Sequence, residues 1–360
     1  MENGRHLYGG AQQVLYLLEG LANAGVQSTL VCPPDSAICA AAVNLDCKIV
    51  AIPTAGDLDV GFGQRLAGWL KDCQPDLLHV HSRRGADIWG GVAARQAGTP
   101  AVLSRRVDNP DFPVIGKVKY RLYERVIAIS EEIRSQLHVD GVPNSKLRLV
   151  HSAVDAESCQ PTWSREQFLA EFGLQDDELS VICVGQLIPR KGQAVLLDAW
   201  SSVLESCPRA RLILFGKGVS EPELRAQVER QGQGATVNFA GFRNDLRAFL
   251  GHADLLVHPA LREGLGICLL EAQAAAVPIV ASRAGGIPEA VADGVSGLLV
   301  QPEDPAAVAA AVVGLLSNAE QRIAFGQGGR EHVAKHFSRQ AMVSGNLAVY
   351  RELLQEGSNK

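Results

Sequence analysis

Residues 255–300 read LLVHPALREGLGICLLEAQAAAVPIVASRAGGIPEAVADGVSGLLV, and this stretch decides the fold class. Short apolar runs at 255–257, 279–281 and 297–300 are separated by glycine-rich turns and by an alanine-rich segment of helical character. Strands that alternate with helices in this way build a parallel sheet. The stretch therefore predicts an α/β fold.

The same alternation runs through the rest of the chain. Further strands are predicted at 28–32, 48–52, 77–81, 101–104, 125–129, 147–150, 180–184, 211–215 and 237–240. A polar stretch around 155–162 separates two such sets, and 360 residues exceed what one core normally organises. We expect a doubly wound domain over 1–160, a second over 161–337, and a terminal helix over 338–360.

Composition excludes several classes of protein. The chain is 47% apolar and 20% charged, which is typical of a globular protein, and its net charge of -5 offers no field for nucleic acid. The uncharged stretch 305–319 is shorter than the roughly 20 residues of a membrane span. A polar amino terminus and eight cysteines without a C-x-x-C pair indicate a cytoplasmic chain with buried free thiols.

The beginning of the chain departs from the usual order of a parallel α/β sheet. Gly9 and Gly10 precede a helix predicted over 11–25, but no apolar strand comes before them. Either the start lies a few residues too late, or the first sheet lacks what is normally a central strand. We favour the late start.

A loop that follows the strand at 180–184 carries two cations. Gly185 opens the loop and Arg190, Lys191 and Gly192 close it before a helix, so backbone N–H groups and both cations are placed to bind a phosphate. The loop is not a P-loop, because Lys191 is followed by glycine and not by Ser or Thr. The alternative is an ordinary solvated Arg-Lys pair.

Two carboxylates stand eight residues apart after the strand at 255–257. Glu263 lies in a glycine-rich turn and Glu271 in the following apolar helix, both at the carboxyl end of the sheet, where open α/β folds bind ligands. An unpaired carboxylate in such a helix would be costly, so Glu271 is expected to accept hydrogen bonds from hydroxyls. The alternative is that the Glu271 carboxylate only interacts favourably with the positive end of the helix dipole and binds no ligand.

The run 262–300 resembles the donor-binding signature of family 4 of the retaining glycosyltransferases, which has the same pair of glutamates. The resemblance covers nearly the whole chain, because it extends to four further features and to the terminal helix: the loop at 190–192, Phe239-Ala240-Gly241-Phe242, the strand end at His79-Val80-His81, and the turn at Gly9-Gly10. It implies the GT-B fold, in which two Rossmann-like domains face a cleft and the last helix crosses back to the first domain.

The resemblance also implies roles in catalysis. Glu263 corresponds to the residue that holds hydroxyls of the donor sugar, Lys191 to the lysine that binds the diphosphate, and His81 to the histidine near the donor sugar. The family usually has arginine after Gly185, but this chain has Gln186, and Arg190 is the candidate to replace the missing cation.

Donor binding is implied for a further set of positions. Glu271 corresponds to the residue that holds the nucleotide ribose. The remaining positions are the turn and loop residues Gly9, Gly10, Gly185, Gln186, Gly264, Leu265 and Gly266, with Phe242 and Arg243 where the family holds the nucleobase.

Two short motifs resemble metal-binding motifs, but neither predicts a metal site. Asp57-Leu58-Asp59 is a D-x-D, but it lies far in sequence from the donor signature. His79 and His81 have no third ligand at suitable spacing, and we expect His79 to point to the opposite strand face and to pack or cap a helix. No metal and no other cofactor are expected, because the sugar nucleotide is a substrate.

A cation-rich segment follows the strand at 101–104, on the side where the resemblance places the acceptor. Its six cations, interspersed with apolar and aromatic residues, are Arg105, Arg106, Lys117, Lys119, Arg121 and Arg125. Such a mixture suits an anionic membrane surface or a phosphorylated, lipid-linked acceptor. The alternative is a solvated helix with some core residues.

These observations and the resemblance predict a metal-independent glycosyltransferase that moves a hexose from a nucleotide diphosphate sugar to an acceptor hydroxyl. Retention of configuration is what the resemblance implies. The expected acceptor is a cell-envelope glycolipid or a precursor of lipopolysaccharide or another polysaccharide. We expect the protein on the cytoplasmic side, with peripheral contact to the inner face of the membrane. The alternatives are a GT-B epimerase or phosphorylase, and a non-catalytic sugar-binding protein.

Overall fold

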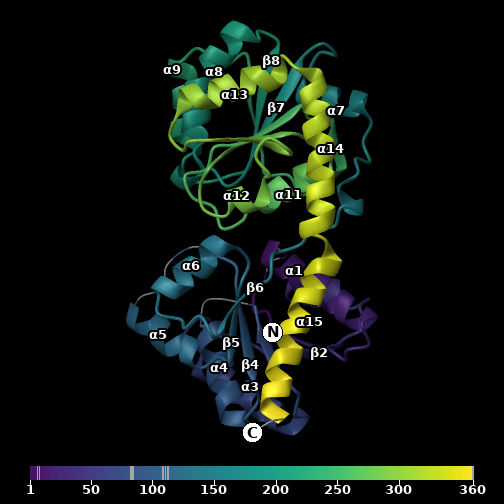
Figure 1. Ribbon diagram of the computed structural model, residues 1–360, viewed down its shortest axis with the longest axis vertical. Coiled ribbons are helices and arrows are strands. Elements are labelled where there is room, and N and C mark those ends of the chain that lie inside the picture. Colours follow the sequence, from purple (N-terminus) through teal and green to yellow (C-terminus); the bar gives the residue numbers. More distant parts are fainter. Residues whose placement is uncertain are drawn as a thin grey trace. The chain divides into compact units, whose positions relative to one another are not determined.

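A computed structural model describes residues 1–5, 7, 9–81, 85–107, 109, 111 and 113–358, without the side chains at 113–115, 117, 357 and 358. The chain forms two compact units: unit 1 comprises Met1–Ala153 with Arg339–Lys360, and unit 2 comprises Val154–Ser338 (Figure 1). The boundaries expected from the sequence, 160/161 and 337/338, lie within seven residues of the division found at 153/154 and 338/339.

Unit 1 holds two parallel sheets. β1 (Thr29–Cys32) pairs with β2 (Lys48–Ala51), and a four-stranded sheet has the order β3-β4-β5-β6. The members of the second sheet are β3 (Leu78–Val80), β4 (Ala101–Arg105), β5 (Arg125–Ala128) and β6 (Leu147–Leu149). The backbone of Met1 and Glu2 lies between the sheets, because Glu2 N donates to Val31 O and His81 N donates to Met1 O, both at 3.0 Å.

The helices of unit 1 include the last helix of the chain. They are α1 (Gly9–Asn23), α2 (Ala37–Ala42), α3 (Val60–Cys73), α4 (Ala86–Ala97), α5 (Pro113–Arg121), α6 (Glu131–Val139) and α15 (Arg339–Ser358). α15 packs on α1 in a core that contains Tyr16, Val343 and Tyr350. The approach is close, since a Cβ on Gly20 would lie 2.2 Å from a methyl carbon of Val343.

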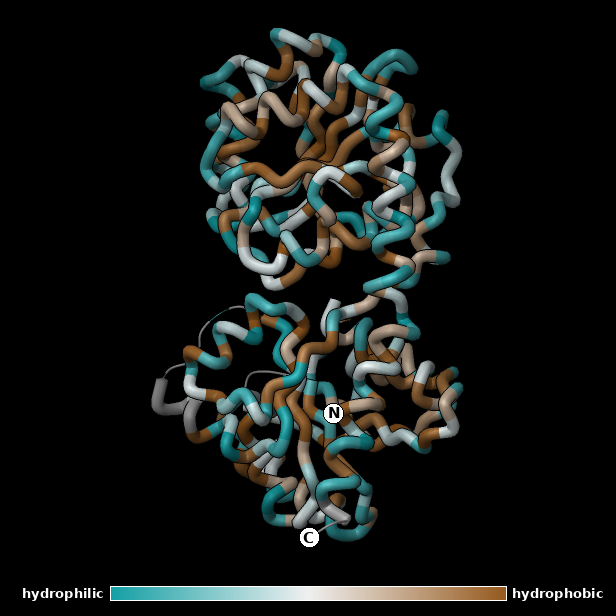
Figure 2. The backbone as a smooth tube through the Cα atoms, viewed as in Figure 1, coloured by the Kyte–Doolittle hydropathy of each residue, from teal (hydrophilic) through white to brown (hydrophobic). Residues whose placement is uncertain are grey.

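Unit 2 is built on one six-stranded parallel sheet with the order β12-β11-β10-β7-β8-β9. Its strands are β7 (Leu179–Val184), β8 (Ala210–Phe215), β9 (Val237–Gly241), β10 (Leu255–His258), β11 (Ile279–Ser282) and β12 (Gly297–Val300). In Figure 2 these strands are coloured mainly as hydrophobic, and they lie in the middle of the unit. Strands buried on both faces need such continuous apolar runs, which is why the sequence shows them so clearly.

The helices of unit 2 follow the strands in alternation. The α-helices are α7 (Arg165–Phe172), α8 (Gln193–Ser206), α9 (Glu221–Arg230), α10 (Leu246–Phe249), α11 (Ile267–Ala274), α12 (Ile287–Ala290), α13 (Pro305–Leu316) and α14 (Ala319–His336), with short 3₁₀ turns at Glu157–Cys159, Pro189–Lys191 and Leu250–His252. All twelve predicted strands are present, which confirms the α/β fold class. None of the helices in the described residues is long and apolar enough to cross a membrane.

Candidate functional site

The loops after β7 and β10 meet at the point where the strand order of unit 2 changes direction. β7 and β10 are neighbours in the sheet, and open α/β sheets bind ligands outside the carboxyl ends of such a pair. The loops touch closely: Leu261 N donates to Arg190 O at 2.9 Å. Gly192 has a φ of +69°, and a Cβ there would lie 1.9 Å from Pro259 O, so this position requires glycine.

Three charged side chains converge where these loops meet. Lys191 Nζ forms an ion pair with Glu263 Oε2, and His258 Nε2 donates to the same oxygen at 3.0 Å. The Lys191 and Glu263 side chains are 12% and 13% exposed and that of His258 is 1% exposed. Burial opposes the charge on Glu263, but His258 and Lys191 outweigh it and hold the pKa of the carboxyl well below its usual range.

His258 was not predicted from the sequence. It ends β10, and its Nδ1 lies 3.8 Å from the sulfur of Cys268 near the start of α11. Burial lowers the pKa of His258, but the Cys268 sulfur and the Glu263 carboxylate act in the opposite direction and raise it to about 9. The ring is therefore an imidazolium at neutral pH, and it fixes both the charge and the position of Glu263.

The turn after β11 supports the Glu263 loop from beneath. Gly286 N donates to Glu263 O at 2.9 Å, and a Cβ on Gly285, which has a φ of +54°, would lie 2.1 Å from the same oxygen. Gly264 N donates to Glu263 Oε1 at 3.1 Å. Leu265 is 2% exposed, so its side chain packs inside the loop and offers no surface to a ligand.

Glu271 has a partner that the sequence did not reveal. Its Oε1 accepts hydrogen bonds from Nε and Nη2 of Arg247 in α10, at 2.9 and 2.6 Å. The sequence predicted hydroxyl partners for Glu271 and gave no sign of this arginine; the role in binding the nucleotide ribose stays a prediction. Arg247 lies 24 residues before Glu271 and also donates to Ser158 Oγ at 3.2 Å, so a polar cluster surrounds the carboxylate.

The first residues of the β7 loop present mainly backbone. Gln186 is exposed, and its carbonyl accepts from the buried Gln193 Nε2 at 3.0 Å. A Cβ on Gly216, at the end of β8, would lie 1.9 Å from Gly185 O. Arg190 is partly buried and directly precedes Lys191 in the chain, so it stays a candidate for the missing phosphate cation.

The predicted nucleobase position divides into two different environments. Phe242, which follows β9, is 55% exposed, and Lys217 Nζ lies 5.3 Å from the centre of its ring. Arg243 forms ion pairs with Glu171 and Asp245 and stacks over Phe249 at 5.3 Å. Arg243 is therefore part of the packing around α7 and α10, whereas the exposed ring of Phe242 is available to a flat ligand.

In unit 1, His81 lies with Arg106 near the start of α1. Arg106 Nη2 donates to His81 Nδ1 at 3.3 Å, Arg106 Nη1 donates to Ser152 Oγ at 3.1 Å, and Gly10 lies beside the Arg106 side chain. Because a guanidinium can only donate, Nδ1 of His81 is the acceptor and Nε2 carries the proton. Burial, His79 and Arg106 hold the pKa of His81 well below its usual range, so the ring is a neutral donor.

The packing role expected for His79 is confirmed, but the expectation that it points to the strand face opposite to His81 was wrong. Residues two apart on a strand point to the same face, and the rings of His79 and His81 are 3.8 Å apart. His79 packs in the core of unit 1, with hydrogen bonds to Tyr350 at 2.5 Å and to Ser104 at 2.9 Å.

The cation-rich segment is mostly structural. Arg105 and Lys119 are each 3% exposed, and Lys119 Nζ pairs with Asp87 at 3.0 Å and with Asp111 at 2.6 Å. The assignment of these two residues to a membrane surface was therefore wrong, because both form ion pairs with carboxylates inside unit 1. Arg105 pairs with Asp111 at 3.4 Å. Arg121 is exposed, and the side chain of Lys117 lies outside the described residues.

The D-x-D motif has a structural explanation. Asp59 is the N-cap of α3 and accepts hydrogen bonds from Phe62 N at 2.9 Å and Ala55 N at 2.8 Å. Within the described part of the chain, no group of three or more His, Cys, Asp or Glu side chains is arranged to hold a metal ion.

Comparison with known proteins gives two consistent family matches. The profile described as Glycosyltransferase Family 4 matches residues 8–158, and the profile described as Glycosyl transferases group 1 matches residues 164–332. The D-inositol 3-phosphate glycosyltransferase of Segniliparus rotundus is 35% identical over 81% of this chain, which spans 64% of that relative's length. The enzyme of the same name from Corynebacterium glutamicum strain R is 32% identical over 78% of this chain and 72% of its own length.

Among solved structures, HepE of Anabaena in complex with UDP superposes with a TM-score of 0.85 at 18% identity, covering 98% of both chains. This likeness confirms the GT-B fold that the sequence predicted. Together with the profile matches over both units and the relatives above 30% identity, it shows that the chain belongs to glycosyltransferase family 4.

Proposed function

We propose that this protein transfers a hexose from a nucleotide diphosphate sugar to an acceptor hydroxyl, with retention of configuration and without a metal. The observation that carries the proposal is the cluster of Lys191, Glu263 and His258 where the β7 and β10 loops meet. One cation there can move from the carboxylate to a phosphate, while the imidazolium keeps the carboxylate ionised and in place for sugar hydroxyls.

Charge development at the leaving group fits these residues. When the bond from C1 to the phosphate oxygen breaks, negative charge grows on the diphosphate and positive charge on the sugar. Lys191, Arg190 and the amino end of α11 stabilise the first charge, and the ionised Glu263 stabilises the second. In unit 1, His81 offers a neutral Nε2–H donor, which suits a sugar hydroxyl.

The proton of the acceptor hydroxyl goes to the leaving phosphate in this proposal. The acceptor oxygen bonds to C1 on the face from which the diphosphate departs, and the same phosphate oxygen takes the proton. Two properties of unit 2 support this route: the depressed pKa makes Glu263 a poor base, and His258 is already protonated at neutral pH.

The donor and acceptor are proposed from the relatives. HepE was solved with UDP, which supports a uridine nucleotide as the first donor to test, with the exposed Phe242 ring as the surface on which the base stacks. For the acceptor, we propose a cell-envelope glycolipid or polysaccharide precursor. The names of two relatives support a second candidate, a phosphorylated polyol such as D-inositol 3-phosphate.

The proposed location is the cytoplasmic side of the membrane, where sugar nucleotides are available. Peripheral contact to anionic lipid would have to rest on Arg121 and other exposed cations, because Arg105 and Lys119 are buried. Equal sedimentation of wild type and Arg121→Ser with phosphatidylglycerol vesicles at low salt would remove Arg121 from that proposal.

Release of the nucleotide diphosphate tests the activity. UDP-glucose and UDP-N-acetylglucosamine are each mixed with the protein and with D-inositol 3-phosphate or a glycolipid extract, and free UDP is measured. Transfer requires acceptor-dependent UDP release, and an anomeric NMR signal of the product with the donor's configuration establishes retention. An epimerase would release UDP or isomerise the donor without acceptor, a phosphorylase would require inorganic phosphate, and a sugar-binding protein would release nothing.

A further inference from the structure

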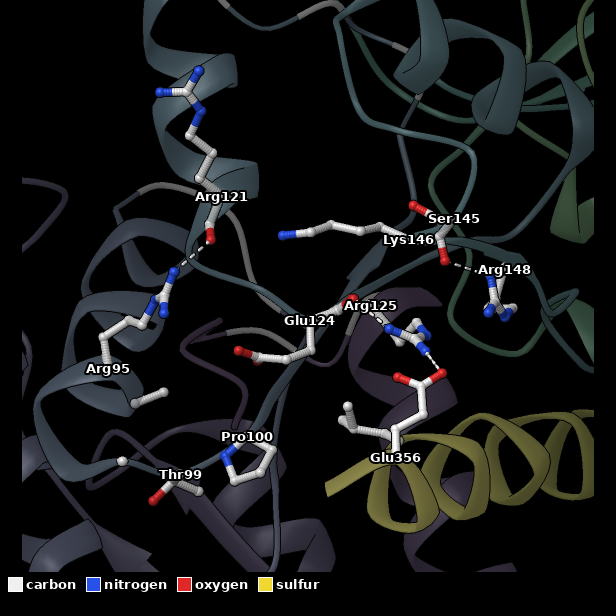
Figure 3. Close-up of a pocket in the computed structure, with 13 residues that line it drawn as sticks. Arg95, Thr99, Pro100, Arg121, Glu124, Arg125, Ser145, Lys146, Arg148 and Glu356 are labelled. Carbon is white, nitrogen blue, oxygen red and sulfur yellow. Dashed lines mark hydrogen bonds and ion pairs between the residues drawn. The ribbon is translucent and has the colours of Figure 1, made fainter. Parts of the chain in front are cut away.

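A cavity of about 720 Å³ lies at the edge of unit 1 opposite to His81 and Arg106. Its walls come from the amino-terminal ends of β4, β5 and β6, from the end of α4, and from α15 (Figure 3). His81 and Arg106 instead follow the carboxyl ends of β3 and β4. Because these strands are parallel, the two groups of residues lie at opposite edges of the sheet. The cavity is therefore separate from the proposed transfer site.

Positive charge dominates this cavity. Five cations line it, Arg95, Arg121, Arg125, Lys146 and Arg148, against two carboxylates, Glu124 and Glu356. Arg125 and Arg148 are already neutralised by ion pairs with Glu352, and Arg125 also pairs with Glu356. The charge available to a ligand therefore comes from the other three cations.

Lys146 and Arg95 are placed to use that charge. The Lys146 side chain extends into the cavity, with Nζ bound to the carbonyl oxygens of Tyr123 at 2.5 Å and of Tyr120 at 3.5 Å (Figure 3). Arg95 donates to the carbonyl of Arg121 at 3.3 Å from the facing wall. Within the described residues neither of these two cations has a carboxylate at ion-pair distance. The Arg121 guanidinium turns away at the rim (Figure 3).

The electrostatic environment of Lys146 is consistent with a cavity that binds an anion. Burial and the positive charges of Arg95 and Arg125 lower the pKa of Lys146, against the opposing effect of Glu124. The Glu124 carboxylate offsets part of this positive charge, and its Oε2 also accepts a hydrogen bond from Ala101 N at 2.7 Å. A phosphate between Lys146 and Arg95 would relieve the repulsion through charge-assisted hydrogen bonds.

We propose that this cavity binds a phosphate group through Lys146 and Arg95, at a site separate from the donor diphosphate. The group belongs to a small phosphate ester or to a lipid headgroup, since none of the described lining residues is an aromatic on which a nucleobase could stack. Leu353 and Glu356 of α15 form one wall, so an occupant would also contact the last helix of the chain.

Pyrophosphate is the probe, and Lys191→Ala in the full chain is the background, because it weakens binding at the donor site. Calorimetry compares this protein with one that also carries Arg95→Ser and Lys146→Met. The matched control instead carries Arg209→Ser and Arg225→Ser, which remove two exposed cations of unit 2. We expect binding about tenfold weaker in the pocket variant and unchanged in the control, with deuterium-exchange protection at 121–125 and 145–148.

Equal affinity in the pocket variant and the control, or no pyrophosphate binding and no vesicle binding that depends on these cations, overturns the proposal. If Lys146→Met prevents folding, Arg95→Ser alone decides, with an expected loss of about threefold. Vesicles of phosphatidylglycerol and of phosphatidylcholine identify the source. Sedimentation with the former alone, reversed by pyrophosphate, assigns a lipid headgroup, whereas pyrophosphate binding without sedimentation assigns a soluble ester.

Discussion

Replacing His258 with Gln removes the imidazolium next to Glu263 while keeping a side chain of similar length. The rise in the pKa of His258 from 6.5 to about 9 means that the folded protein binds this proton more tightly than the unfolded chain. At 1.36 kcal/mol per tenfold change in proton affinity, the stabilisation is roughly 3 kcal/mol. His258 is 1% exposed, so solvent screens the interaction little.

The sign of the pH dependence follows from the direction of the shift. A raised pKa stabilises the folded state fully below pH 6.5, and the stabilisation is lost as pH rises through about 9. Urea unfolding of unit 2, followed by tryptophan fluorescence, is therefore measured from pH 6 to pH 10 for wild type and His258→Gln. We expect the difference in unfolding free energy to shrink by about 3 kcal/mol over this range.

The subtraction of the two proteins removes titrations that they share, such as those of the buried thiols. Cys268→Ala is the companion variant: it keeps the contact between His258 and Glu263 and removes the sulfur at 3.8 Å, so its pH dependence should fall between those of wild type and His258→Gln. A free-energy difference that stays constant with pH, or that grows as pH rises, would refute the assignment of His258 as an imidazolium.

Four further outcomes follow from the site. Lys191→Ala should lower turnover on the order of 100-fold, because its charge matters most as the leaving diphosphate forms; near wild-type turnover would shift that role to Arg190. Glu271→Ala should weaken donor binding about tenfold or more in calorimetry, whereas unchanged affinity would leave Glu271 only its pairing with Arg247. Treatment with EDTA should leave UDP release intact, and loss restored by a divalent metal would contradict metal independence. Asp59→Ala should lower the unfolding free energy of unit 1 in urea titration without changing UDP release, because it removes the cap of α3.

The sequence alone determined the α/β class, the positions of all twelve strands and the two loops that carry the site. These properties depend on local patterns: continuous apolar runs mark buried parallel strands, and glycines mark turns that a side chain would block, as Gly192 and Gly285 do. The pair of glutamates was visible for the same reason, because eight residues span a turn and the first part of a helix.

Only the tertiary structure decided which side chains share a site. Lys191 and Glu263 are 72 residues apart in sequence and meet because β7 and β10 are neighbours in the sheet. Local patterns carry no information on such pairing, so they missed His258 as the partner of Glu263. The burial of Lys119 was missed for the same reason. In the sequence it looked like a surface cation, yet folding places two carboxylates around it. A charge acquires its role from the partners that strand order and packing bring to it, and these are fixed only when the whole unit has folded.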